Sequence, residues 1–249
     1  MIDIRFNIEK LIAYGLFNNF FEKGDYNFVR NQLLEFLEVD DVFEGSINFD
    51  PNEHIESILE PIINYAIQNK IISEDTQNNR EAFSAKIMGF LIGRPSEINN
   101  IFNTIKQTQG LKAATDWYYN FSQKTNYIQT ARIAKNISWT STTTKGEVDI
   151  TINLSKPEKD PKDIAAALKH KASSYPKCIL CAENEGFKGN FNLPARHNHR
   201  IIPIELENET WYFQYSPYVY FNENSILLSK EHRQMKIDKM TFKRLLKFF

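Results

Sequence analysis

The spacing of apolar residues changes near Asn126, and this change limits the possible folds more than any other feature of the sequence. Over residues 55–67, and in several stretches before and after, apolar residues recur every three or four positions, as in amphipathic helices. Over residues 148–154 they alternate with polar residues, as in a half-buried strand. The sequence therefore predicts an α+β protein with a helical first part (1–125) and a mixed second part (126–249).

The same patterns predict the individual elements. Helices are expected around residues 8–16, 28–37, 55–67, 95–105 and 113–121, with Pro61 as a kink or break in the third. A strand or two are expected over 128–139 and a further strand over 148–154, followed by a short helix from Asp160. Strands are then expected over 200–206, 211–215 and 218–228, and a helix over 236–249. The helical stripes are interpreted as faces of a hydrophobic core.

Charge and composition exclude some classes of protein. The net charge is -1, so there is no overall basic field to attract nucleic acid. The sequence contains no apolar run long enough to span a bilayer, and its first residues do not resemble a signal peptide. Two cysteines do not make a disulfide framework. We therefore expect a cytoplasmic protein that binds neither nucleic acid nor membrane.

The two cysteines, Cys178 and Cys181, form a C-x-x-C pair. This spacing is found in zinc sites, in redox motifs and in ordinary buried turns, and the pair alone does not decide among them. A structural zinc site needs four ligands, and there is no second C-x-x-C. Further ligands would have to be carboxylates or histidines, and the downstream histidines are His197, His199 and His232.

The run Arg196-His197-Asn198-His199-Arg200 has two interpretations. Its cationic side chains could contact a phosphate. Alternatively, it is a solvated loop that precedes a strand. His54 and His170 are interpreted as solvated helix residues without a functional role.

Four segments are similar to one enzyme family. They are DITINLSKPEKDP (149–161), SYPKCILC (174–181), PARHNHRIIPI (194–204) and FQYSPYVYFNE (213–223). They resemble the galactose-1-phosphate uridylyltransferases, in the type 2 form of Gram-positive bacteria. The helical first part also resembles that form, with GRPSE (93–97) as an anchor. The resemblance covers the whole chain and is stronger after Lys112.

The resemblance implies a fold and an activity. Residues 126–249 would be the first portion of a HIT-like antiparallel sheet domain with flanking helices, and residues 1–125 a helical extension. Members of the family exchange UMP between UDP-glucose and galactose 1-phosphate, giving UDP-galactose, through a uridylyl-histidine intermediate.

The nucleophile of the family lies in an H-x-H-x-Q motif. His197-Asn198-His199 does not match this motif, because Arg200 and Ile201 follow it. We therefore expect no catalytic residue in this chain, a truncation before the motif, and no activity of the chain alone. The alternative is a non-catalytic fragment that binds zinc or UDP.

The resemblance also assigns residues to binding roles. Cys178, Cys181 and His232 match three zinc ligands of well-studied relatives, whose fourth ligand lies beside the catalytic motif. Tyr220 and Asn222 match a strand that packs against uracil and ribose, although plain strand packing would also explain them. Lys156 and Lys159 lie where relatives carry arginines near the nucleotide, although a solvated turn explains them equally well.

The chain departs from the family pattern at residues 222–225. Where the type 2 form is expected to read Asn-Glu-His-Cys, this chain has Asn222-Glu223-Asn224-Ser225, without a ligand-type side chain in the last two positions.

An incomplete sheet would expose an unpaired edge and apolar surface. We therefore expect association, either as a homodimer or with a polypeptide that supplies the missing half.

Overall fold

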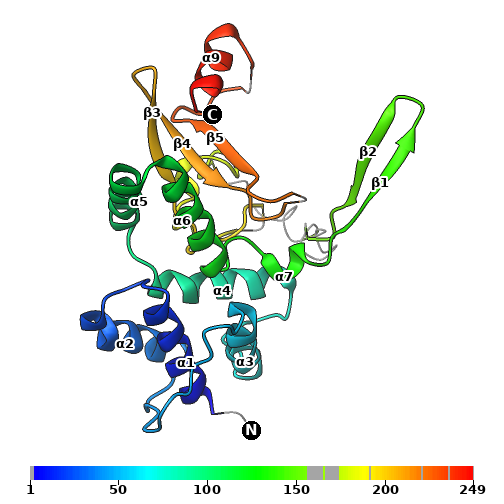
Figure 1. The fold of residues 1–249 in the computed structure, drawn as a ribbon. Coiled ribbons are helices and arrows are strands. Elements are labelled where there is room, and N and C mark those ends of the chain that lie inside the picture. Colours follow the sequence, from blue (N-terminus) through cyan, green and yellow to red (C-terminus); the bar gives the residue numbers. More distant parts are fainter. Residues whose placement is uncertain are drawn as a thin grey trace.

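The computed structural model describes residues 3–155, 165, 174–190, 192–219, 221–234 and 236–248. Helices fill most of its first part, and two antiparallel sheets lie in its second part. The predicted α+β class is therefore confirmed (Figure 1).

The helices of the first part lie close to the predicted positions. They are α1 (Ile4–Phe17), a 3₁₀ turn η1 (Lys23–Asp25), α2 (Tyr26–Phe36), α3 (Ile55–Gln68), α4 (Gln77–Leu91), α5 (Pro95–Gln109), α6 (Leu111–Lys124) and the short α7 (Thr130–Ile133). The predicted apolar stripe of α3 is buried, and α3 continues through Pro61 without a break. Pro95 occupies the first turn of α5, where a missing backbone N–H costs nothing.

The strands form a hairpin and a separate three-stranded sheet. The hairpin pairs β1 (Ile137–Thr143) with β2 (Gly146–Ile152), and the sheet has the order β3 (Ile202–Leu206), β4 (Glu209–Tyr215), β5 (Ser225–Ser229). The last helix is α9 (Lys239–Phe248), inside the range predicted for it. The helix predicted from Asp160 falls outside the described residues, apart from Ala165.

Two sequence-based expectations about strands are wrong. Residues 130–133 form α7 rather than a strand. The strand expected from residue 218 begins only at Ser225. The reason is a closed loop before β5: the Ser216 N–H donates to the Asn224 carbonyl at 2.9 Å, and Glu223 has a φ of +57°, which is incompatible with an extended strand.

One hydrophobic cluster joins the helices to the sheet. Ile202, Phe213 and Tyr215 of the sheet belong to the same buried cluster as the helical stripes. Tyr118 of α6 is fully buried between them, with its ring centroid 5.5 Å from that of Phe213 and 5.3 Å from that of Tyr215. Figure 1 shows α5 and α6 lying against the sheet. The boundary expected near residue 125 remains a prediction.

Arg200 connects the helices to the loop that enters the sheet. Its guanidinium is buried and donates to four backbone carbonyls: those of Ile92 and Gly93 between α4 and α5 at 3.5 and 2.8 Å, and those of His197 and His199 at 2.9 and 2.8 Å. The Tyr118 hydroxyl donates to the Arg200 carbonyl. Burial lowers the pKa of Arg200 to about 10, so the group is still charged at neutral pH.

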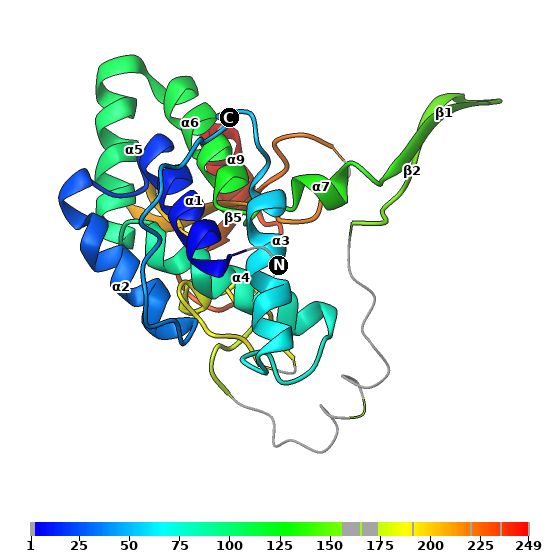
Figure 2. The same cartoon turned by 90° about the horizontal axis from the view of Figure 1, so that it is seen from below.

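The β1–β2 hairpin extends away from the rest of the molecule, as Figures 1 and 2 both show. Several of its large apolar side chains are exposed, including Ile137 and Trp139 on β1 and Val148 and Ile152 on β2. Within the described residues, none of the helices combines the length and the apolar character that crossing a bilayer requires.

Replacing Arg200 tests its role as the connection between helices and sheet. We expect Arg200→Met to lower the free energy of unfolding by roughly 3 kcal/mol, because buried carbonyls lose their donors. Lys145→Met, in the exposed turn of the hairpin, should change it by less than about 0.5 kcal/mol. Urea titration followed by far-ultraviolet circular dichroism measures both, and equal stability of the two variants would contradict the assigned role.

Candidate functional site

The structure brings Cys178, Cys181 and His232 together. The two Sγ atoms lie 3.4 Å apart, and Cys181 Sγ lies 3.0 Å from His232 Nδ1. One ligand atom from each residue lies within 4.8 Å of the others. The cysteines are half-buried and His232, in the segment after β5, is exposed. These residues are called the Cys–His cluster below.

Local hydrogen bonds shape the cysteine turn. The Cys181 N–H donates to the Cys178 carbonyl at 3.2 Å, and a 3₁₀ turn, η2 (Ala182–Asn184), follows. The side chain of Asn184, which is buried, donates to the carbonyls of Cys178 and Cys181 at 2.6 and 2.9 Å. Asn184 therefore fixes the backbone from which both thiols project. Sequence reasoning missed Asn184, although it lies only three residues after Cys181.

The donor set of the cluster fits a zinc ion. Tetrahedral Zn–S bonds of about 2.3 Å place two sulfurs about 3.8 Å apart, so small side-chain movements from the observed 3.4 Å suffice. Partial burial and the hydrogen bond with Cys178 raise the pKa of the Cys181 thiol, so a metal would displace a proton when it binds. The imidazole beside the thiols favours a metal site over a pure dithiol pair.

The segment 196–200 is not a solvated loop, contrary to one interpretation of its sequence. Arg196, Asn198, His199 and Arg200 are all buried. Arg200 is bonded to backbone carbonyls, and the Arg196 guanidinium lies over the Tyr127 ring, 5.4 Å from its centroid. These contacts use the cationic groups inside the fold, so the side chains stabilise the loop instead of forming an open phosphate site.

His199 of this segment is not accessible as a nucleophile, and His197 is half-buried. His199 is buried and stacks on Tyr127 with a centroid separation of 4.0 Å, while its Nε2 donates to Gln214 Oε1 at 2.5 Å. His197 packs on Gly89 of α4, where an added Cβ would lie only 2.9 Å from the His197 Cβ. Burial is the main cause that lowers the pKa of His197 to about 4 and that of His199 to about 3.

The residues predicted to bind a nucleotide are only partly described. Asn222 is exposed, in the loop between β4 and β5. Tyr220, Lys156 and Lys159 lie outside the described residues. The assignment of all four therefore stays a prediction.

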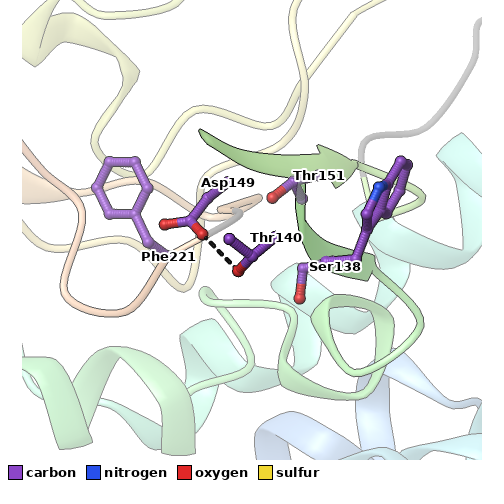
Figure 3. Close-up of a pocket in the computed structure, with 6 residues that line it drawn as sticks. Ser138, Thr140, Asp149, Thr151 and Phe221 are labelled. Atoms are coloured by element: carbon purple, nitrogen blue, oxygen red, sulfur yellow. Dashed lines mark hydrogen bonds between the residues drawn. The ribbon is translucent and has the colours of Figure 1, made fainter. Parts of the chain in front are cut away.

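Next to Asn222, a groove of about 610 Å³ runs between Phe221 and the hairpin. Its described lining residues are Ser138, Trp139, Thr140, Asp149, Thr151 and Phe221. Figure 3 shows Asp149 and Thr140 between Phe221 and the rest of the hairpin, joined by a hydrogen bond. Sequence reasoning missed this groove. The alternation over residues 148–154 was a signal for its polar face, but nothing in the sequence indicated that Phe221 lies opposite.

The fold and the Cys–His cluster define an α+β protein with a donor group of the kind that holds zinc. Comparison with known proteins identifies its family. Residues 20–233 match the family described as "Galactose-1-phosphate uridyl transferase, N-terminal domain". The chain therefore belongs to the galactose-1-phosphate uridylyltransferase family.

Similar curated proteins carry the same name. A galactose-1-phosphate uridylyltransferase of Fusobacterium nucleatum is 49% identical over 241 residues, which are 97% of this chain and 47% of that protein. One of Bacillus subtilis is 44% identical over 243 residues, with the same two coverages. One of Butyrivibrio fibrisolvens is 45% identical over 242 residues, which are 97% of this chain and 62% of that protein. The chain thus spans about half the length of most of these relatives. No solved structure matches it.

The buried His199 predicts how stability depends on pH. Below pH 6.5 the unfolded chain binds a proton on this residue, whereas the folded chain keeps it neutral until the pH approaches 3. Falling pH therefore favours the unfolded state, by up to about 1.4 kcal/mol per pH unit from His199 alone.

We expect the free energy of unfolding of His199→Gln to fall less steeply than that of the native chain as the pH is lowered from 6.5 to about 4. His54→Gln, at an exposed histidine, should keep the native slope. Denaturant unfolding at a series of pH values measures the slopes. Identical slopes for the native chain and His199→Gln would show that His199 does not cause the dependence.

Proposed function

We propose that residues 1–249 form the N-terminal part of a hexose-1-phosphate uridylyltransferase of galactose metabolism, located in the cytoplasm. In the complete reaction a histidine takes UMP from UDP-glucose and passes it to galactose 1-phosphate, forming UDP-galactose. The observation that carries the proposal is the 49% identity to a relative of that name over 97% of this chain. The chain spans about half of that relative, so we propose the activity for a complete enzyme of which this chain is the N-terminal part.

The proposed contribution of this part is binding rather than bond cleavage. The 249 residues contain no H-x-H-x-Q sequence. Supporting this division of roles, the His199 imidazole is buried against Tyr127 and bonded to Gln214, so it is not free to attack a phosphorus atom. We propose that Tyr220 and Asn222 contact the uridine, and that Lys156 and Lys159 neutralise phosphate charge.

The proposed role of the Cys–His cluster is structural. Cys178 Sγ, Cys181 Sγ and His232 Nδ1 would hold a zinc ion, which would cross-link the cysteine turn to the segment after β5. A fourth ligand would come from solvent or from another part of a complete enzyme. His232 follows β5, the strand after the loop with Asn222, and so connects the cluster to the proposed uridine contacts.

The chain alone should bind UDP but not transfer uridylyl groups. Calorimetric titration tests binding, and an assay of UDP-galactose formation tests transfer. Adding the C-terminal remainder of the Fusobacterium nucleatum relative as a separate polypeptide is expected to generate activity. Transfer by the chain alone that disappears in His197→Ala or His199→Ala would refute the proposed division of roles.

Zinc binding is tested on the same preparation. After dialysis against zinc and then against metal-free buffer, the chain should retain about one zinc ion, measured by atomic emission. Cys178→Ser and His232→Ala should each reduce retention at least about tenfold, because the loss of a residue that only orients a metal ligand already costs that much. His54→Ala controls for a non-ligand histidine. Equal retention by all variants would contradict the assigned ligands.

The Cys–His cluster also supports a second candidate, a binding fragment that holds zinc or UDP without taking part in catalysis. This candidate predicts UDP and zinc binding but no activity with any added C-terminal polypeptide. The complementation experiment therefore separates the two. In either case the exposed apolar side chains of the hairpin and of α9, such as Trp139 and Phe242, support association with a second chain of the same kind or with that polypeptide.

A further inference from the structure

We propose that the helical first part of the chain positions the loop between β4 and β5 (216–224) for nucleotide binding, and that Tyr218 is the positioning residue. The inference rests on the proposed function, because this loop carries Asn222, a proposed contact of the uridine. Contacts that run from α3 and α4 through α7 to the loop support it.

Two glutamates of the helical first part hold α7 in place. Glu56 Oε1, on α3, accepts hydrogen bonds from the Thr130 hydroxyl at 3.2 Å and from the Ala131 N–H at 3.3 Å. Glu81 of α4 forms an ion pair with Arg132, and both of these side chains are half-buried. Salt screens such a partly buried pair less than an exposed one. The short helix α7, which leads into the hairpin, is thus fixed to two helices of the first part (Figure 1).

The segment that contains α7, residues 129–136, contacts three consecutive residues of the loop. The contacts are the Gln129 N–H donating to the Pro217 carbonyl at 3.1 Å, the Arg132 guanidinium 5.4 Å from the centroid of the Tyr218 ring, and the side-chain N–H of Asn136 donating to the Val219 carbonyl at 2.8 Å. These contacts fix the first half of the loop, whereas Asn222, in its second half, is exposed.

Tyr218 also connects the loop directly to the helical first part. Its hydroxyl donates to Glu81 Oε2 at 2.8 Å, while Glu81 Oε1 contacts Arg132. Burial is the main cause that raises the pKa of Tyr218 above its usual value, so the hydroxyl keeps its proton and donates at neutral pH. Hydrogen bonds to a charged carboxylate are stronger than those between neutral groups. One carboxylate of α4 therefore binds both α7 and the loop.

The helical first part contains a second Tyr–Glu–Arg trio, which offers a matched control. The Tyr26 hydroxyl donates to Glu9 Oε2, and Arg30 forms an ion pair with Glu9 at 2.9 Å. The Arg30 guanidinium lies 4.4 Å from the centroid of the Tyr26 ring. This trio joins α1 to α2, which lie on the side of α4 away from the sheet (Figure 1). The same chemical change can therefore be made far from the loop.

The test removes one hydroxyl at a time without changing the charge of the protein. Tyr218→Phe loses the hydrogen bond to Glu81. Calorimetric titration should show that this variant binds UDP roughly fivefold more weakly than the native chain, because the loop spends less time in the position that binds. Tyr26→Phe should bind UDP within about twofold of the native chain. Circular dichroism spectra that match the native spectrum verify that both variants are folded.

Hydrogen–deuterium exchange without ligand gives a second measurement, which reports on the loop itself. Tyr218→Phe should speed exchange in residues 216–224, and Tyr26→Phe should leave exchange there unchanged. Both variants should lose similar stability toward urea, since each loses a hydrogen bond from a hydroxyl to a carboxylate. A similar loss of stability with a selective effect on the loop distinguishes positioning from general destabilisation.

The possible results separate this inference from the proposed function. UDP binding by Tyr218→Phe that equals native binding would overturn the positioning role alone. Equal weakening in both variants, or weaker binding without faster exchange in the loop, would overturn it as well. A native chain that binds no UDP would overturn the proposed function and, with it, any role of Tyr218 in nucleotide binding.

Discussion

The buried guanidinium of Arg200 is the interaction on which the rest of the arrangement depends. It satisfies carbonyls at the junction of α4 and α5 and within its own loop, so the helices and the entry to β3 are held together. The next residue continues the connection, because the Ile201 N–H donates to Glu185 Oε1 at 2.7 Å. Glu185 follows the cysteine turn. Helices, sheet and Cys–His cluster therefore meet at residues 196–201, and a buried charge held by four hydrogen bonds has few alternative positions.

Much of the fold could be predicted from periodicity, and the errors have identifiable physical causes. The α3 stripe was recognisable because its apolar positions repeat with the period of a helix and face a core. The loop before β5 was mistaken for a strand because its aromatic residues have high strand propensity, while the hydrogen bond between Ser216 and Asn224 that closes it is not visible in a pattern. The burial of Arg196 and Arg200 was missed because their partners are a ring and backbone carbonyls, which leave no complementary charge in the sequence.

The candidate site likewise contains residues that the sequence could identify and a groove that it could not. Cys178 and Cys181 could be found from their spacing, but His232 lies 51 residues beyond Cys181, and only the family resemblance joined it to the pair before the structure did so. The groove could not be predicted, because it depends on a loop and a hairpin that meet only in three dimensions. These parts lie on one path: the loop with Asn222 and Phe221 leads through β5 to His232. This continuity supports an account in which the nucleotide contacts the loop while the cluster anchors the end of β5, the strand that follows the loop.

Hydrogen–deuterium exchange with and without UDP-glucose tests that account most directly, because it locates bound ligand without any substitution. The account predicts that saturating UDP-glucose slows exchange in the loop between β4 and β5 (216–224), while exchange in α1–α3 stays unchanged. Slower exchange restricted to the helices, or no change in the loop at saturation, would contradict it.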